Sequence, residues 1–163
     1  MSNGNIIIRE IKKSDNPQME QVIKDCFPEF GIPLTGTAYE DVETTKMFES
    51  YQNNNEVYFV IDKDGQVLGG AGIKQLKDFK TDICELQKMY FSPKIRGMGY
   101  GKILFEKCLQ AARNLGYKQC YIETEPYLEA AIHIYESFGF KHLDKPLGNT
   151  GHFSCGVWMI KDL

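Results

Sequence analysis

Stretches in which apolar residues alternate with polar ones, or cluster in short runs, predict the strands of this chain. Residues 56–61, 66–75 and 83–91 are rich in β-branched and aromatic residues, and residues 62–65 (DKDG) are typical of a hairpin turn. The glycines within 66–75 weaken a strand, which indicates a bulge or the close approach of another group. This part of the chain therefore predicts an antiparallel sheet.

Helical spacing dominates further along the chain. A helix is expected over residues 99–115, because apolar residues recur there at helical spacing and Gly116 stands where a C-cap glycine ends a helix. Its apolar stripe is formed by Ile103, Leu104, Cys108, Ala111, Ala112 and Leu115. Residues 118–124 then predict a strand parallel to 83–91, and residues 128–138 predict a second helix.

The N-terminal part predicts a strand over residues 5–11 and a helix after it. Asp15 or Asn16 is suited to cap this helix, and Pro28 and Pro33 are expected to end it. Its buried side is expected to carry Met19, Val22, Ile23 and Cys26, which have helical spacing.

The pattern weakens between residues 31 and 56, where we expect a further helix from about Tyr39. Its interspersed acidic residues would keep an exposed face solvated. The tail predicts two strands, over 140–143 and 153–161. Together these elements predict a single α/β (α+β) domain spanning residues 1–163, with a mixed, mostly antiparallel central sheet flanked by about four helices.

Length and composition fit one domain of ordinary type. The chain has 163 residues, of which 42% are hydrophobic, and this is enough to bury a sizeable core. Its formal net charge of −3 and the lack of basic runs argue against nucleic-acid binding. No stretch approaches the ~20 apolar residues of a membrane span, and the N-terminus lacks a secretory pattern, so we expect a cytoplasmic protein. Five cysteines without a C-x-x-C pair argue against disulfides and a structural zinc site, and no metal is expected.

Three glycines stand at the start of the long helix, in residues 96–102 (RGMGYGK). Glycine lets the backbone approach a ligand closely, and the first N–H groups of a helix attract anions, which indicates a phosphate-carrying cofactor. A Walker A loop would need glycine where Arg96 stands and Ser or Thr where Ile103 stands. A dinucleotide fingerprint would need glycine at Lys102, so both alternatives fail.

The remaining pattern, R-x-x-G-x-G, resembles the loop of the GNAT acyltransferases, the Gcn5-related N-acetyltransferase superfamily. Residues 85–93 (ELQKMYFSP) resemble the fourth strand of that family, and residues 130–140 (AAIHIYESFGF) resemble its tyrosine-bearing helix. The resemblance covers essentially the whole chain and is specific over residues 84–140. It implies the GNAT fold, with a β-α-β core that binds acetyl-CoA.

In this family the glycine loop holds the pyrophosphate of acetyl-CoA, and the fourth strand accepts the pantetheine arm. The resemblance therefore implies that the N–H groups of Met89 and Phe91 polarise the thioester. It also implies that Arg96 contacts phosphate, where the alternative is an ordinary surface arginine. The residues implied to bind the cofactor are Met89, Tyr90, Phe91, Arg96, Gly97, Met98, Gly99, Tyr100, Gly101 and Lys102. One departure is Leu128, where many relatives carry an asparagine that contacts the cofactor arm.

Acetyl transfer to an amine needs a base, since an ammonium group with a pKa near ~10.4 is protonated at pH 7. Glu85 is the best candidate, because burial in an apolar strand would raise its pKa and similar family members carry glutamate there. The alternative is that it faces water or pairs with Lys74 or Lys88. Glu123 and Glu125 are weaker candidates for the base.

Tyr135 stands where the family carries the phenol that protonates the leaving thiolate, and its alternative role is packing. A covalent route through Cys84 or Cys155 would need a neighbouring base. His152 lies three residues before Cys155, which in a strand places the two on opposite faces, so this route is not expected. Trp158 either lines the acceptor pocket or packs in the interior.

These observations predict an enzyme that transfers the acetyl group of acetyl-CoA directly to a primary amine. Acidic residues in 39–56, a region that the resemblance places over the acceptor pocket, indicate a small cationic acceptor more than a protein. Neither nucleic acid nor a membrane is expected as a partner, and the resemblance implies dimerisation through the C-terminal strands. The alternative function is a non-catalytic acyl-CoA-binding sensor or assembly module with the same fold.

Overall fold

A seven-stranded sheet forms the centre of the molecule in the computed structural model, which describes residues 4–163. In chain order the strands are β1 (Ile6–Glu10), β2 (Val57–Lys63), β3 (Gln66–Gln75), β4 (Ile83–Phe91), β5 (Gln119–Thr124), β6 (Lys141–Leu143) and β7 (Val157–Asp162). The α-helices are α1 (Asn16–Phe30), α2 (Tyr100–Asn114) and α3 (Glu129–Ser137). The spatial order is β1-β2-β3-β4-β5-β7-β6, and within the described chain only β4 and β5 pair in parallel. The predicted mixed, mostly antiparallel sheet is confirmed.

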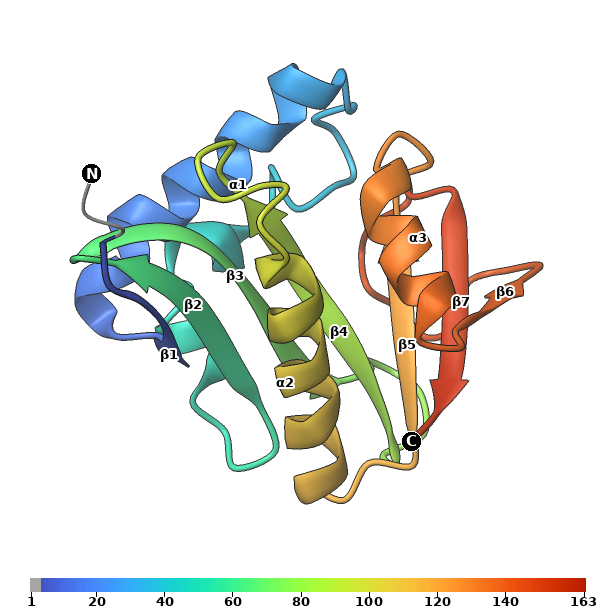
Figure 1. Ribbon diagram of the computed structural model, residues 1–163. Coiled ribbons are helices and arrows are strands. Elements are labelled where there is room, and N and C mark those ends of the chain that lie inside the picture. The colour runs from blue at the N-terminus through green and yellow to red at the C-terminus, as the bar shows by residue number, and fades with distance from the viewer. Residues whose placement is uncertain (1–3) are drawn as a thin grey trace.

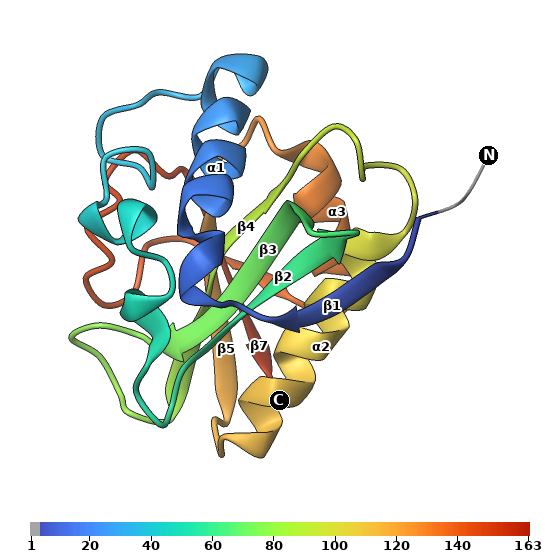
Figure 2. The same ribbon diagram turned by 90° about the vertical axis from the view of Figure 1, so that its left-hand side faces the viewer.

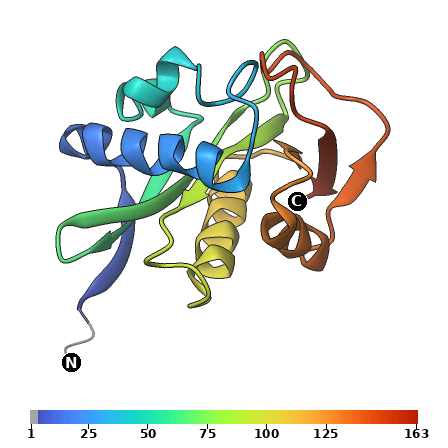
Figure 3. The same cartoon turned by 90° about the horizontal axis from the view of Figure 1, so that it is seen from above.

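The sheet lies between two layers of helices (Figure 1, Figure 2). Helix α1 covers one face, while α2 and α3 cover the other, as seen from above in Figure 3. The core beneath α1 includes Met19, Ile23, Phe27, Met47 and Val60, and the core beneath α2 and α3 includes Leu104, Phe105, Cys108, Ile122 and Tyr135. Each helix therefore turns one apolar side to the sheet. No helix within residues 4–163 is both long enough and apolar enough to cross a membrane.

Strands β4 and β5 touch at one end and separate at the other, which Figure 1 shows clearly. They pair only from Ile83 to Glu85 on β4, opposite residues 119–121 of β5. Beyond that point β4 continues to Phe91 without β5 as a neighbour. One edge of its main chain is consequently open to a ligand.

A bulge accompanies this separation. The register between β3 and β4 shifts between Gly70 and Gly72, and Lys88 in the facing part of β4 has a positive φ of 49°. A bulge bends its strand and increases its twist. The glycines of β3 predicted a bulge or the close approach of another group: at Gly70 and Gly72 the ring of Tyr58 lies close, and the extra residue of the bulge is on the facing part of β4.

One prediction for the N-terminal part is wrong, and another holds for position only: Asp15 is the N-cap residue of α1, but its side chain makes no capping bond. Pro28 does not end α1, which continues to Phe30 and stops at Gly31, whose φ is +65°. The carboxylate of Asp15 does not cap α1, because it is bound by the guanidinium of Arg9 on β1, with N···O distances of 2.8 and 2.9 Å. The carboxylate that the local pattern assigned to helix capping is thus bound by Arg9, which lies outside the helix.

The helix predicted from about Tyr39 does not form. Its place is taken by two short 3-10 turns, Val42–Thr45 and Glu49–Tyr51, so the described chain has three α-helices where about four were expected. Three hydroxyl side chains in this segment donate to nearby carbonyls: Thr44 to Ala38, Thr45 to Val42 and Ser50 to Lys46. Such local bonds compete with a regular helix.

The tail also departs from prediction. Strand β7 begins at Val157, so residues 153–156 are not part of it. Residues 144–156 instead form an irregular segment that reaches across to residues 35–41. Strand alternation therefore does not apply to His152 and Cys155.

Candidate active site

A cleft of about 590 Å³ opens where β4 leaves β5, between the end of β4 and the N-terminal ends of α2 and α3. Its lining includes nine of the ten residues implied to bind the cofactor: Met89, Tyr90, Phe91, Arg96, Gly97, Gly99, Tyr100, Gly101 and Lys102. The tenth, Met98, is not among the lining residues and is 56% exposed. The structure thus brings the predicted cofactor residues together around one cavity.

The glycine loop has the backbone that phosphate binding requires. Gly97 and Gly99 have φ of +74° and +84°, a region that favours glycine, and a Cβ at either position would meet no atom within 4 Å. Gly99 is the N-cap residue of α2, so the first N–H groups of the helix point out of its end. A Cβ on Gly101 would lie 3.3 Å from Ile134, which shows how closely α2 approaches α3. The loop can therefore present main-chain donors to an anion.

Arg96 binds protein groups in this structure. Its Nε and Nη2 donate to the carbonyl oxygen of Phe91 at 3.0 and 2.7 Å, and its Nη1 pairs with Glu29 of α1. The guanidinium also lies over the ring of Phe30, 4.8 Å from the centroid. Arg96 thereby ties the end of β4 to α1, and its contact with phosphate stays a prediction.

A smaller pocket of about 50 Å³ adjoins the cleft and shares Met89, Tyr90 and Leu128 with it. Both predicted catalytic residues line it, Glu85 from β4 and Tyr135 from α3. Its remaining polar lining is Thr37, Gln87, Lys88, Glu123, Thr124, Glu125, His152 and Cys155. We refer to this cavity as the acceptor pocket, after the role that we propose for it. The structure therefore joins a base candidate and an acid candidate beside the cofactor cleft.

Glu85 is 4% exposed, and its burial raises the pKa of its carboxyl group to about 7. The hydrogen bond from Gln87 opposes this increase, whereas the charge of Glu123 adds to it. The alternative pairings do not occur, since Lys74 Nζ contacts Glu43 at 3.2 Å and Lys88 Nζ contacts a different carboxylate. Glu85 therefore exchanges its proton near neutral pH.

Tyr135 is 3% exposed and packs against the ring of Phe105, with centroids 5.3 Å apart. Burial raises the pKa of its hydroxyl group well above the usual value, so Tyr135 is held as a neutral phenol that can donate a proton. Leu128, the departure from the family pattern, lies on the border of the cleft and the acceptor pocket. Trp158 lines neither cavity and packs near Leu76 and Tyr121.

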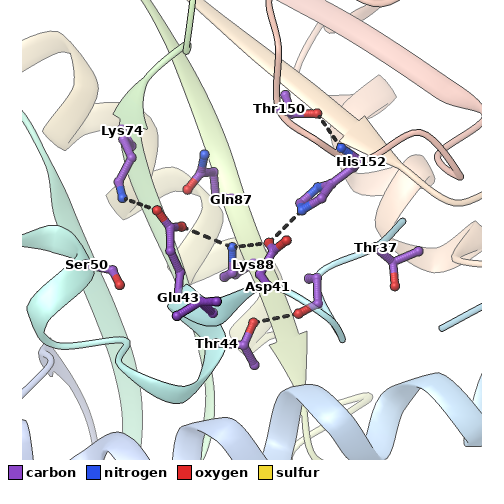
Figure 4. Close-up of polar contacts among 12 residues, drawn as sticks. Thr37, Asp41, Glu43, Thr44, Ser50, Lys74, Gln87, Lys88, Thr150 and His152 are labelled. Atoms are coloured by element: carbon purple, nitrogen blue, oxygen red, sulfur yellow. Dashed lines mark hydrogen bonds and ion pairs between the residues drawn. The ribbon is translucent and has the colours of Figure 1, made fainter. Parts of the chain in front are cut away.

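The patterns in the sequence did not predict a chain of charged groups beside the acceptor pocket (Figure 4). His152 Nε2 lies 2.6 Å from Asp41 Oδ2, and Lys88 Nζ lies 2.9 Å from the same oxygen. Burial lowers the pKa of His152, but the hydrogen bond to Asp41 and the charge of that carboxylate together outweigh burial, and the net pKa is raised. His152 and Asp41 are 111 positions apart, and no local pattern indicates that they meet.

The prediction that His152 and Cys155 lie on opposite faces is wrong. Both line the acceptor pocket, and their ligand atoms lie within 4.8 Å of each other and of Glu123. The prediction failed because these residues precede β7 and do not follow strand alternation. Cys84, the other thiol considered, is fully buried in the core.

Comparison with known proteins agrees with this geometry. The profile of the Acetyltransferase (GNAT) family matches residues 16–140. The chain is 40% identical over 158 residues to the uncharacterized N-acetyltransferase YjgM of Escherichia coli K12, covering 96% of this chain and 95% of the relative. A GNAT-family acetyltransferase structure from Staphylococcus aureus superposes with a TM-score of 0.85 at 18% identity, covering 97% of this chain and 99% of that one.

Structures of similar fold have been solved with the cofactor. The PaiA N-acetyltransferase of Thermoplasma acidophilum, in complex with coenzyme A, has a TM-score of 0.77 at 18% identity and covers 98% of this chain and 99% of its own. YncA of Salmonella typhimurium, with acetyl-CoA, has a TM-score of 0.77 at 19% identity, covering 96% and 93%. From its profile match and its similarity to YjgM, the chain belongs to the GNAT family and is an acetyl-CoA-dependent N-acetyltransferase.

Proposed function

We propose that this enzyme transfers the acetyl group of acetyl-CoA directly to the primary amine of a small cationic molecule, with both substrates bound at once. The observation that carries the proposal is the position of the acceptor pocket. It contains Glu85 and Tyr135, and it shares Met89, Tyr90 and Leu128 with the cofactor cleft. An amine in the pocket and a thioester in the cleft would therefore meet along β4.

The cofactor would be held mainly by main-chain groups. The N-terminal end of α2 and the loop with Gly97 and Gly99 would bind the pyrophosphate. The open edge of β4 would take the pantetheine arm, and N–H groups at Met89 and Phe91 would face the charge that develops on the thioester oxygen. Donors placed in this way are worth about 2.7–4 kcal/mol each in comparable sites.

Proton transfer would use the two buried side chains. The ammonium form of an acceptor, with a pKa near ~10.4, cannot attack, and releasing its proton at pH 7 costs about 4–5 kcal/mol. Glu85, with a pKa of about 7, accepts this proton directly or through water. The neutral nitrogen then attacks the thioester carbon and the C–S bond breaks. Tyr135 gives its hydroxyl proton to the departing thiolate, and the second proton that the nitrogen loses on forming the amide returns, directly or through water, to the tyrosinate.

The charge of the acceptor pocket favours a cationic acceptor. Three glutamates, Glu85, Glu123 and Glu125, line it, while the ammonium of Lys88 is already paired with Asp41 and Glu43. Within the described residues, the buried Oε1 of Glu125 has no hydrogen-bond partner. A buried acceptor oxygen of this kind is stabilised when a ligand supplies an N–H donor.

Two loops, residues 35–41 and 144–156, contact each other at the acceptor pocket. Because they restrict access to the pocket, they favour a small acceptor over a protein chain. The main-chain N–H of Ser154 donates to the carbonyl of Gly36 at 3.3 Å, and the ring of Phe153 rests on Gly36. His152 and Asp41 form a second link between the same segments. Figure 3 shows the segment after α1 beside the segment before β7.

A panel of matched amines tests the proposal. We would measure thiol release from acetyl-CoA with a short α,ω-diamine, the monoamine of the same carbon chain, and the amino acid that carries a carboxylate at the far end. The diamine is expected to exceed the other two in kcat/KM by about tenfold or more, since one added ion pair of about 1.4 kcal/mol gives that factor. A preference for the amino acid would contradict the cationic acceptor.

Calorimetric titration with CoA and acetyl-CoA separates binding from turnover. Binding without turnover of any amine or peptide would favour the non-catalytic sensor.

We also assign the reaction to the cytoplasm, because all five cysteines are free thiols, which suits a reducing compartment.

A further inference from the structure

One wall of the acceptor pocket gathers three different metal-ligand groups. The ligand atoms of Glu123, His152 and Cys155 all lie within 4.8 Å of one another. Glu123 is on β5, and the other two stand in the irregular segment before β7. Carboxylate, imidazole and thiolate are the groups that bind zinc in proteins. The acetyl-transfer mechanism uses none of the three as acid or base.

The imidazole of His152 is oriented as in a metal site. Its Nε2 bonds to Asp41 Oδ2 at 2.6 Å, which leaves Nδ1 as the ring nitrogen for a ligand. Asp41 is itself held by Lys88, whose Nζ lies 2.9 Å away (Figure 4). Histidines that bind metals usually bond through the other ring nitrogen to a carboxylate, which fixes the ring and raises its basicity.

The carboxylate of Glu123 is held in place as well. Its Oε1 accepts a hydrogen bond from the hydroxyl of Tyr121 at 2.7 Å, and its Oε2 accepts one from the hydroxyl of Thr150. Each carboxylate oxygen has a second lone pair, so these bonds orient Glu123 without using up its capacity to bind an ion.

An independent observation comes from Glu125. Its side chain lies in the same pocket next to Cys155, and the residue is only 5% exposed. Its Oε1 is buried and, among residues 4–163, has no hydrogen-bond partner. A buried, unpartnered carboxylate oxygen in the same pocket, on a residue next to Cys155, is suited to a cation.

From this geometry we propose that Glu123, His152 and Cys155 bind a zinc-class divalent cation, with Glu125 as the fourth protein ligand. A tetrahedral zinc site has bonds of about 2.0–2.3 Å, so the ligand atoms of Glu123, His152 and Cys155 must draw together by about 1 Å, and the carboxylate of Glu125 must turn toward them. Two of the ligands stand in an irregular segment, where no strand pairing fixes the main chain. Binding converts the Cys155 thiol to a thiolate and releases its proton to solvent.

The position of this site gives the ion a consequence for catalysis. It lies on the wall of the acceptor pocket, where Glu123 and Glu125 face the space proposed for the amine. An ion there neutralises these carboxylates and occupies that space. Zinc therefore inhibits acetyl transfer competitively with the amine. This consequence rests on the proposed function, whereas ion binding does not.

Cobalt titration tests the site directly, because a thiolate bound to Co²⁺ gives a charge-transfer band in the near ultraviolet. We expect the reduced protein to show this band, with one ion bound per chain and displacement by zinc. Cys155→Ser should abolish the band. The control is Cys26→Ser, because Cys26 is a thiol on α1 at the cofactor cleft, beside Arg96, and its loss should leave the band intact. Asp41→Asn should weaken zinc binding by about 10–100-fold, as expected for a group that orients a ligand.

Other outcomes overturn the proposal. They are the absence of a charge-transfer band in the unmodified protein, and a band of full intensity in Cys155→Ser. If Cys155→Ser does not fold, His152→Gln is used, and unchanged cobalt affinity in that variant rejects the site. Cobalt binding without inhibition of acetyl transfer by zinc would keep the site and reject the inhibition. Failure of every amine to react would reject the proposed function and leave the cobalt result standing.

Discussion

The hydroxyl group of Tyr58 on β2 donates a 2.7 Å hydrogen bond to the main-chain carbonyl of Lys88 on β4, passing over the intervening strand β3. The bond is possible because β3 carries Gly70 and Gly72 beneath the ring. A Cβ on either glycine would lie 2.5 Å from an atom of Tyr58. Lys88 is the residue with positive φ in the bulge, so this tyrosine holds the bend that turns the end of β4 toward the cofactor cleft.

Replacing Tyr58 by Phe should therefore affect both stability and cofactor binding. The carbonyl of Lys88 is left buried and unpaired, which lowers the free energy of unfolding by about 1–3 kcal/mol. We also expect the KM for acetyl-CoA to rise, because β4 loses its support. Tyr117→Phe is the matched control, since that hydroxyl also donates to a main-chain carbonyl, of Asn55 at 2.6 Å, away from the cleft. Equal KM values in the two variants would contradict the role of Tyr58.

Glu85→Gln should lower kcat by about 10²–10⁴-fold, the usual contribution of a general base. In the unmodified enzyme the rate should rise with pH through about 7, as the carboxyl group of Glu85 loses its proton. The Gln variant should lose this rise. His152 has a raised pKa and lines the same pocket, so His152→Gln is measured alongside and should keep it. A rise that persists in Glu85→Gln and vanishes in His152→Gln would assign the base to the histidine.

Glu85 should also make stability depend on pH. Its pKa is about 7 in the folded protein against 4.5 for an ordinary glutamate, so the folded state holds a proton that the unfolded chain releases. The stability contributed by protonated Glu85 is complete below pH 4.5 and is lost as the pH rises through about 7. At 1.36 kcal/mol per pKa unit this amounts to about 3 kcal/mol. Urea unfolding at pH 5 and pH 8 should show Glu85→Gln gaining stability relative to the unmodified protein at the higher pH. An equal difference at both pH values would refute the raised pKa.

Tyr135→Phe should lower kcat while leaving the affinity for acetyl-CoA nearly unchanged. The phenol is proposed to protonate the thiolate, and its ring packing against Phe105 and Phe140 is preserved in the variant. Steady-state kinetics and calorimetry with acetyl-CoA separate the two effects. An unchanged kcat would leave Tyr135 with packing alone.

The residues of the cofactor cleft could be predicted from the sequence because each group of them follows a local pattern. The glycines that begin α2, the strand β4 and the tyrosine of α3 each carry their own pattern within about ten residues. Their order along the chain also fixes the β-α-β crossover that brings them together. Glu85 could be recognised in the same way, as a carboxylate inside an apolar strand.

The wall of the acceptor pocket could not be derived in this way. Asp41 and His152 stand in irregular segments 111 positions apart, and their contact depends on how these two loops pack against each other. The helix expected from about Tyr39 failed for a related reason, since hydroxyl groups such as that of Thr44 bond locally. Asp15 resembled a helix cap and instead paired with Arg9. Local pattern describes main-chain tendencies, which local side-chain bonds overrode after Tyr39 and a contact with another element overrode at Asp15.

Two glycines at opposite ends of α2 offer a controlled test of the cofactor loop. Gly99 and Gly116 have φ of +84° and +89°, and a Cβ on either would meet no atom within 4 Å. Glutamate at either position adds similar backbone strain, of about 1–2 kcal/mol, so the two variants should lose similar stability. Only Gly99 lines the cleft, and there a carboxylate would repel the pyrophosphate from the end of the helix. Calorimetry should therefore show that Gly99→Glu abolishes CoA binding and that Gly116→Glu retains it. Equal loss in both variants would mean that strain in α2, and not charge at the loop, weakens binding.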